Sequence, residues 1–274
     1  MTGLGPFDLY GSEFLALYAA LGLVAVIASV LIPPFLRPEG HPARPADEDE
    51  LALLAGGRER FAEAVAVRLL AAGSAIVQSG GTLQIRDPRG GRTLAERRVV
   101  ALSSPIRWKD VTDTLTGPAE TGERRLEEKG LLLDKATALQ MRLIQTAPLV
   151  LLFAFGLTKW IIGSMRDRPV AFLGALLVLT FFAALLRFGM LDRRTRAGKQ
   201  VAAEARADAA RLRRAVPSDE AALAVALFGT AVLAGSYLSD FHRMRSTNGG
   251  GDGGSSSDGG SSSDGGSGCG GCGG

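Results

Sequence analysis

Two apolar runs separated by only seven residues restrict the fold of this chain more than any other feature. They occupy residues 143–162, "LIQTAPLVLLFAFGLTKWII", and residues 170–190, "VAFLGALLVLTFFAALLRFGM". At a rise of about 1.5 Å per residue, a helix of this length approaches or crosses the ~30 Å hydrocarbon core of a bilayer. So short a connection predicts a helical hairpin. A hairpin buried in a soluble domain is the alternative, and it is disfavoured because the chain contains a third such run.

The third run, residues 14–32, reads "FLALYAALGLVAVIASVLI" and has no charged residue before Pro33 and Pro34. A cleaved signal peptide is the alternative to a membrane anchor. Residues 1–13 lack the Lys or Arg of a signal peptide, and no small-x-small cleavage site precedes the prolines. We therefore expect a retained anchor and three transmembrane helices in all.

The distribution of positive charge predicts the orientation. Residues 192–214 carry eight Lys or Arg residues against three acidic ones, which is typical of a cytoplasmic segment. Counting back places the N-terminus and the hairpin turn outside and residues 37–142 inside, although Arg166 and Arg168 in the turn argue against this. Only five of the 31 basic residues are lysine, as in proteins of GC-rich bacteria, so we expect the bacterial inner membrane.

Further charged and apolar residues complete the prediction for the membrane part. Lys159 and Arg187 lie near the ends of their runs, and we expect their side chains to extend to the interface. A fourth apolar stretch, residues 221–238, is rich in Ala and Gly. It is expected to pack on the cytoplasmic part or to lie in the interface, rather than to span. If it does span, the C-terminal tail lies outside.

A small cytoplasmic domain is expected between the first and second spans. Glu48–Leu54 and Arg58–Ala72 are typical of helices, with a break at Gly56-Gly57 between them. Gly73 is placed to cap the second helix. Helices followed by a β-hairpin resemble half of a winged helix. The helix over Arg58–Ala72 is of mixed charge, and the net charge of the chain is only +3, so nucleic acid is an unexpected partner.

The expected hairpin follows directly, with strands over residues 75–78 and 82–85 around Ser79-Gly80-Gly81. A similar pattern recurs later in the chain. Residues 68–77, "RLLAAGSAIV", and 125–134, "RLEEKGLLLD", both read Arg-Leu-x-x-x-Gly followed by apolar residues. They are either two copies of one helix–Gly–strand unit or a chance match.

Three segments, "GLTKWIIGSMRDRPVAFLGALL", "RRTRAGKQ" and "AVALFGTAVLAG", together with "GLLLD" before the hairpin, resemble a family of uncharacterised bacterial integral membrane proteins. Members of that family pair a conserved transmembrane domain with a low-complexity C-terminal tail rich in Gly, Ser and often Cys. The resemblance covers about residues 10 to 274. It implies a membrane protein and carries no known chemistry or functional residues to this chain.

Catalytic motifs are not evident in the sequence. The two histidines, His41 and His242, lie far apart, and the chain has no HExxH, GxSxG or P-loop pattern. We therefore expect neither an enzyme nor a cofactor.

The tail, residues 246–274, is expected to be disordered. Fourteen of its last 26 residues are Gly, and "DGGSSS" recurs at residues 252 and 258 before "DGGSGC". Cys269 and Cys272 form a C-x-x-C pair with three possible roles: two ligands of a metal, a redox pair, or a substrate for a tail-modifying enzyme that cyclises Ser and Cys to azoles. The alternative to all three, a flexible spacer, is favoured.

The sequence thus predicts a mainly α protein with three transmembrane helices, a small α/β winged-helix-like cytoplasmic domain and a disordered tail. Its expected role is that of a non-enzymatic scaffold in the lipid bilayer, with an unidentified cytoplasmic protein as partner. A carrier of a modified or metal-binding tail and a membrane-bound winged-helix-like regulator are the alternatives. The expected segments are an outer N-terminus (1–13), spans (14–32, 143–162, 170–190), a linker (33–46), the cytoplasmic domain (47–142), a turn (163–169), a basic cytoplasmic helix (191–215), an apolar helix, packed or interfacial (216–245), and the tail (246–274).

Overall fold

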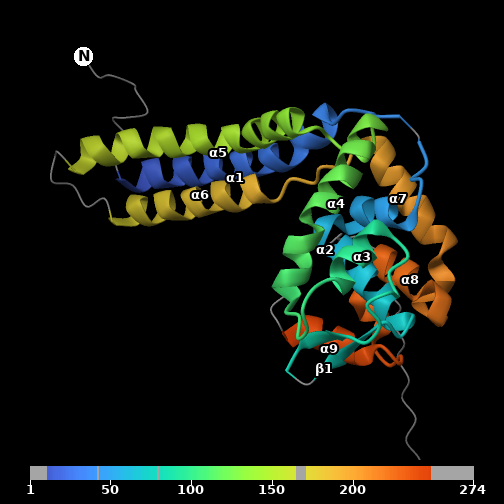
Figure 1. The fold of residues 1–274 in the computed structure, drawn as a ribbon. Helices are drawn as coiled ribbons and strands as arrows, with labels where there is room; N and C mark the ends of the chain where they lie inside the picture. Colours follow the sequence, from blue (N-terminus) through green and yellow to red (C-terminus); the bar gives the residue numbers. More distant parts are fainter. Residues whose placement is uncertain (1–10, 42, 79, 165–170, 248–274) are drawn as a thin grey trace, which may run out of the picture.

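The structure is a computed structural model that describes residues 11–41, 43–78, 80–164 and 171–247. Three long helices form an arm, and the other elements form a domain at one end of it (Figure 1). Within the described residues there are nine α-helices and a single sheet of two strands. The predicted mainly α-helical fold is confirmed.

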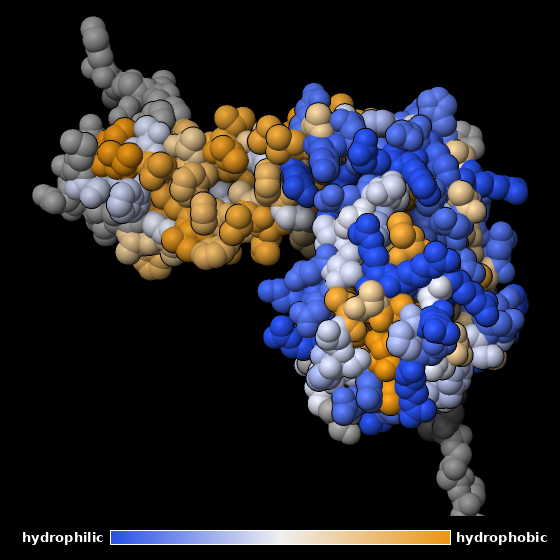
Figure 2. Space-filling model, in the orientation of Figure 1, coloured by the Kyte–Doolittle hydropathy of each residue, from blue (hydrophilic) through white to orange (hydrophobic). Residues whose placement is uncertain are grey.

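The arm consists of α1 (Gly11–Leu36), α5 (Lys135–Ser164) and α6 (Ala171–Gly189), and all three helices are long and apolar enough to cross a membrane. Apolar side chains cover its outer surface, whereas the domain is mostly polar (Figure 2). A bilayer is the solvent that such a surface requires. The three predicted spans are therefore present, although α1 continues through Pro33 and Pro34 and α5 begins at Lys135.

All three helices meet the domain at the same end of the arm: α1 and α6 with their C-terminal ends and α5 with its N-terminal end (Figure 1). α5 packs against both α1 and α6. Inside the arm, the Tyr18 hydroxyl is hydrogen-bonded to Thr180 Oγ1 at 3.1 Å. Gly156 provides the space for the Tyr18 ring, because a Cβ atom at this position would overlap it.

The sequence predicts that the Arg187 side chain extends to the membrane interface. In the structure it turns inward to α1 instead. Its Nε and Nη2 atoms donate to the backbone oxygen of Ser29 at 3.1 and 2.8 Å. That oxygen lies four residues before Pro33, which has no N–H to donate to it. Gln145 Nε2 in turn donates to the Arg187 carbonyl at 2.7 Å. Arg187 thus replaces the helical hydrogen bond that Pro33 removes, and it joins α6 to α1. Lys159 lies over the Phe14 ring, with its Nζ 5.0 Å from the centroid.

Replacement of Arg187 by Leu is expected to destabilise the arm by about 1 to 2 kcal/mol, because Ser29 O then loses its donors inside the bilayer. Pro33→Ala restores the backbone N–H four residues after Ser29, which can donate to Ser29 O. It should recover part of this loss, with a coupling free energy between the two substitutions of about 0.5 kcal/mol or more. Unfolding of the full chain in mixed micelles, titrated with a denaturing detergent, measures both effects.

Arg142→Leu is the matched control for this cycle. Arg142 lies on α5 with its guanidinium over the Phe188 ring, 5.6 Å from the ring centroid, whereas the donors to Ser29 O come from Arg187. The effect of Arg142→Leu should therefore be the same with and without Pro33→Ala. Equal costs of Arg187→Leu in both backgrounds would show that Arg187 does not compensate for the proline.

The domain is built from both sides of the membrane hairpin. α2 (Glu48–Ala71), α3 (Leu94–Val100) and α4 (Trp108–Glu128) precede it, and α7 (Arg196–Asp208), α8 (Ala221–Phe228) and α9 (Ser239–Thr247) follow it, with short 3-10 turns at Ala210–Arg213, Ser218–Glu220 and Thr230–Leu233. One apolar core joins residues from both stretches, among them Val65, Leu115 and Leu126 with Val225 and Phe241. The α5–α6 hairpin is therefore inserted into the domain.

The main contact between the two stretches is that of α2 with α8. Both helices carry buried alanines at helical spacing, Ala62 and Ala66 on α2 and Ala222 and Ala226 on α8. Small side chains allow the axes of two helices to approach closely. α8 is consequently packed into the core beside α2.

The expected apolar helix over residues 216–245 is not one helix. Gly229 has φ +89°, which L side chains rarely adopt, and α8 ends there. A 3-10 turn follows over Thr230–Leu233, and α9 begins at Ser239. Because α8 is only eight residues long and is buried in the domain, the stretch at residues 221–238 does not cross the membrane in this structure.

The predicted hairpin is confirmed, with β1 (Ala75–Gln78) pairing antiparallel to β2 (Thr82–Ile85) and Ala75 opposite Ile85. The winged-helix comparison is not confirmed. Leu83 pairs with Ile106 in an isolated bridge on the other edge of β2, and the helix before the hairpin is the central helix of the domain.

The recurrent Arg-Leu-x-x-x-Gly pattern ends α2 and α4 in the same way. At the end of α2, Gly73 N–H donates to Leu70 O and Ser74 N–H to Leu69 O; at the end of α4, Gly130 N–H donates to Glu127 O and Leu131 N–H to Leu126 O. Both glycines have φ near +70°. This is the Schellman arrangement, which favours Gly after the helix. The shared cap accounts for the glycine in both stretches without a duplicated unit: the first is followed by strand β1, and the second by a bridge of Leu132 to Arg194.

Candidate anion-binding cleft

The segment between α6 and α7, residues 190–195, joins the arm to the domain, and we call it the junction segment. Its backbone pairs with the segment after α4: Leu133 N–H donates to Arg193 O at 2.7 Å and Thr195 N–H to Leu131 O at 3.0 Å. At the start of α7, Arg196 N–H donates to Pro38 O at 3.1 Å. Three chain segments are thus held together where the membrane helices end.

Asp192 is the acidic residue of the junction segment. Arg37 Nη1 lies 3.4 Å and Lys199 Nζ 3.2 Å from its carboxylate, and Arg194 N–H donates to it at 3.1 Å. Burial raises the pKa of Asp192, but the bond from the Arg194 N–H and the charges of Arg194, Arg37 and Lys199 outweigh it, so the pKa lies below its usual range. Asp192 therefore remains ionised near neutral pH.

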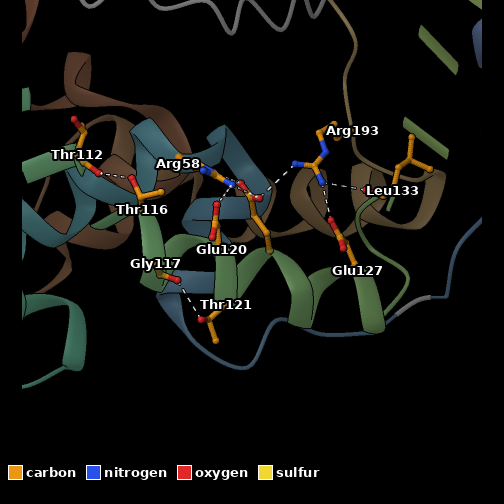
Figure 3. Close-up of polar contacts among 10 residues, drawn as sticks. Arg58, Thr112, Thr116, Gly117, Glu120, Thr121, Glu127, Leu133 and Arg193 are labelled. Carbon is orange, nitrogen blue, oxygen red and sulfur yellow. Dashed lines mark hydrogen bonds and ion pairs between the residues drawn. The ribbon is translucent and has the colours of Figure 1, made fainter. Parts of the chain in front are cut away.

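Arg193 points toward the carboxylates of α4. Its Nη2 atom donates to Glu127 at 2.7 Å, and its Nη1 atom to Glu123 at 3.4 Å. Arg58 of α2 reaches Glu123 from the other side at 2.7 Å and Glu120 at 3.4 Å. Figure 3 shows Arg58 beside Glu120, and Arg193 beside Glu127 and Leu133. Both arginines on this side of the junction are therefore paired with carboxylates.

Arg194 points in the opposite direction, to the kink in α2. Gly57 adopts φ 73° and ψ −161°, a conformation open essentially to Gly alone, and the first part of α2 ends there. The carbonyl groups at a helix end carry partial negative charge. Ala55 O accepts hydrogen bonds from Arg194 Nη2 and, at 3.1 Å, from Arg206 Nη2 of α7. Two arginines from different segments thus meet at one carbonyl oxygen.

A second helix end lies beside the first. Arg206 Nε donates to Leu227 O in the last turn of α8 at 3.2 Å, and Arg60 Nη1 donates to Val225 O at 3.4 Å. Gly229 is favoured here because of its φ of +89°, and the Arg60 guanidinium occupies the space beside its Cα. The ends of two helices are therefore stabilised by guanidinium groups.

These arginines line a cleft of about 1460 Å³ that begins at the end of α6, at Gly189 and Met190. Six arginines and four acidic residues line it: Arg60, Arg193, Arg194, Arg206, Arg213 and Arg245, and Glu59, Glu63, Glu123 and Asp192. The acidic residues are paired with cations: Glu63, for example, lies 3.0 Å from Arg245, which also contacts Glu59. Because the arginines outnumber the acidic residues, the lining carries a net positive charge.

The pKa of Arg194 reflects this charge. Burial lowers it, and the nearby charges of Arg206, Arg37 and Arg60 lower it further, against the opposing effect of Asp192. Like charges held together at this point favour the binding of an anion. In the part of the chain that the structure describes, no group of three or more His, Cys, Asp or Glu residues could hold a metal ion.

The residues singled out from the sequence lie elsewhere. Cys269 and Cys272 lie outside the described residues, so their expected roles stay predictions. His242 Nδ1 lies 3.2 Å from Thr230 Oγ1 on the domain. The sequence does not single out Arg60, Arg194 and Arg206 as site residues. The available signal is the basic run after α6, which predicts the orientation of the protein in the membrane but not a binding site.

Comparisons of the chain with protein-family models, curated proteins and solved structures gave no match. What the three-helix arm and the domain define is the class: an integral membrane protein with a helical extramembrane domain.

Glu123 makes the stability of the domain dependent on pH. Burial raises its pKa, but the hydrogen bond and charge of Arg58 and the charge of Arg193 outweigh burial and lower the pKa overall. A carboxyl group whose pKa is lowered by folding stabilises the fold at pH values above its ordinary pKa of about 4.3. This stabilisation is lost as the pH falls through the pKa of the group in the folded protein. Glu123→Gln should cost about 1 to 3 kcal/mol at pH 7, and the cost should decrease progressively as the pH falls below about 4.3. Chemical unfolding of the full chain, followed through Trp108 in a Trp160→Phe background, measures this.

Glu120→Gln is the matched control, one turn away on the same helix. The Glu120 side chain is half exposed and lies 3.4 Å from the same Arg58. An exposed ion pair of this kind contributes at most about 1 kcal/mol. If the two substitutions have equal effects at pH 7, the buried position of Glu123 is not what matters.

Proposed function

We propose that this protein is a non-enzymatic scaffold that holds a rigid interaction domain at the cytoplasmic face of a bacterial inner membrane. The observation that carries this proposal is the insertion of the α5–α6 hairpin into the domain. The core of the domain is formed by chain segments from before and after the membrane hairpin, and the junction segment is hydrogen-bonded where the membrane helices end. The surface of the domain is therefore held in a fixed position relative to the bilayer.

Charge supports the cytoplasmic placement of the domain. The junction segment and α7 carry most of the eight basic residues between Asp192 and Arg214, and they lie directly after α6. Arg37 at the end of α1 lies at the same end of the arm. Basic residues close to the ends of membrane helices favour the cytoplasmic side.

DNA binding receives no support from the helix that precedes the hairpin. In a winged helix this element would enter the major groove of DNA. Here the second half of α2 is buried almost throughout, from Phe61 to Val67, between α4 and α8. A helix enclosed in this way has no free face for a groove, so we do not extend the proposal to nucleic acid.

Crosslinking from single exposed positions tests the scaffold function. A photoreactive residue at Leu94 or Tyr237, which are 66% and 59% exposed on the domain, should give discrete adducts with one or a few proteins in cells. The same residue at Leu151, 71% exposed on the arm, should give lipid adducts.

In a Cys269→Ser, Cys272→Ser background, Tyr237→Cys should react with an impermeant maleimide only after lysis, and Ser164→Cys should react in intact cells. Labelling of Tyr237→Cys in intact cells would reverse the orientation, and protein adducts from neither domain position would contradict the scaffold.

The tail supports a second candidate function, a carrier of a modified segment. α9, the last described helix, is fastened to the domain by Arg245, which pairs with Glu63 and stacks on Trp108 at 4.2 Å from the ring centroid. α9 lies on the side of the domain away from the arm (Figure 1). The last described residue, Thr247, therefore lies away from the bilayer, and the proposed substrates of a modifying enzyme, Cys269 and Cys272, follow it in the chain.

Intact-mass spectrometry of the protein purified from its native host tests this candidate. Conversion of Ser or Cys to an azole removes one water and two hydrogens for each residue. The expected result is a series of such losses that disappears in a Cys269→Ser, Cys272→Ser variant if the cysteines are the substrates. An unmodified mass would leave the tail as a spacer.

A further inference from the structure

Arg194 and Arg206 line the cleft, and each is bonded to a backbone carbonyl group. Arg194 and Arg206 both donate to Ala55 O, and Arg206 also donates to Leu227 O. A backbone carbonyl fixes the orientation of a guanidinium but does not cancel its charge. Each guanidinium has five N–H groups, and the bonds of Arg206 use its Nε and Nη2 atoms, so its Nη1 side is placed to bind a further acceptor.

Carboxylates near this point are held by other cations. Asp192 lies closer to Lys199 and Arg37, at 3.2 and 3.4 Å, than to the Arg194 side chain at 3.8 Å. Glu63 lies closer to Arg245, at 3.0 Å, than to Arg60, at 3.9 Å. Asp192 divides its charge among Lys199, Arg37 and Arg194, so it neutralises Arg194 only in part, and among the described residues no ion pair is formed by Arg206.

Phosphate is the anion that suits this arrangement. Guanidinium groups bind phosphate oxygens through parallel N–H bonds, and an arginine pair fixed in advance loses little side-chain entropy on binding. We propose that the cleft is a binding site for a phosphate-bearing ligand, with Arg194 and Arg206 as the residues that contact the phosphate and Arg60 beside them.

The rest of the cleft indicates a ligand larger than phosphate itself. Its volume of about 1460 Å³ exceeds that of most small-molecule pockets, and apolar side chains form part of its wall: Leu53, Leu54, Met190, Leu191, Phe228 and Val232. Met190 and Leu191 directly follow α6, so the cleft starts where the membrane helix ends. An anionic phospholipid of the inner leaflet and a soluble phosphate compound share the chemistry that the arginines recognise, and the experiment separates them.

Thermal unfolding of the full chain in lipid nanodiscs tests the proposal. Discs of phosphatidylcholine alone, whose phosphate is paired with a cationic choline, are compared with discs that also contain phosphatidylglycerol. Pyrophosphate is added to the phosphatidylcholine discs as the soluble probe, with sodium chloride at equal ionic strength as its control. We expect the midpoint of unfolding to rise with phosphatidylglycerol, with pyrophosphate, or with both.

The Arg194→Lys, Arg206→Lys double variant keeps both positive charges and one donor for Ala55 O. It removes the planar guanidinium groups and with them the parallel N–H donors that would bind phosphate. The variant should fold, as judged by the Trp108 spectrum, and should bind on the order of tenfold more weakly. Arg194→Gln with Arg206→Gln should lose the shift entirely. The charge-matched control is Arg107→Gln with Arg243→Gln, whose side chains are each 75% exposed outside the cleft, and it should keep the shift.

A shift with phosphatidylglycerol alone identifies a lipid headgroup as the source, and a shift with pyrophosphate identifies a soluble one. The proposal is overturned if neither probe stabilises the wild-type chain. It is also overturned if the lysine variant responds as the wild type does, or if the control loses as much of the shift as the cleft variants, because surface charge would then account for the effect.

Discussion

The contact between α2 and α8 closes the domain around the membrane hairpin, and the remaining structure depends on it. The two helices lie on opposite sides of α5 and α6 in the sequence, yet they pack against one another in the core. The arm and the domain are therefore one folding unit, in which the position of the membrane helices constrains the core. A larger residue in place of Ala66 or Ala222 would disturb more than the local packing. It would separate the part of the domain that precedes the membrane hairpin from the part that follows it.

Arginine completes the backbone hydrogen bonding at both interruptions, in α1 and in α2. Pro33 removes a donor in α1, and Arg187 replaces it at Ser29 O. Gly57 interrupts α2, and Arg194 and Arg206 meet at Ala55 O. The geometry of the guanidinium group suits this use, because it can donate to two acceptors at once and is always charged. The interruptions thus place positive charge at positions determined by the backbone.

Local sequence rules predicted the elements well and their assembly poorly. The three spans, the hairpin at residues 75–85 and the cap at Gly73 all depend on residues close together in the chain, and each is present. The stretch at residues 221–238 is also apolar, but its burial depends on α2, which lies far earlier in the chain, so composition could not distinguish a span from a core helix. The same applies to Arg194 and Arg206: their charge is visible in the sequence, but their meeting at Ala55 requires the closed domain.

Arg193 and Arg194 show how one step along the chain separates two electrostatic environments. They are neighbours in an extended segment, so their side chains point to opposite sides. Arg193 meets Glu123 and Glu127 and is neutralised, whereas Arg194 meets a carbonyl oxygen, other arginines and a carboxylate, Asp192, that it shares with Arg37 and Lys199. The ion pairs of Arg193 stabilise the domain. The cleft that both arginines line carries net positive charge, and the repulsion around Arg194, beside the end of a membrane helix, is best explained by an anion that relieves it.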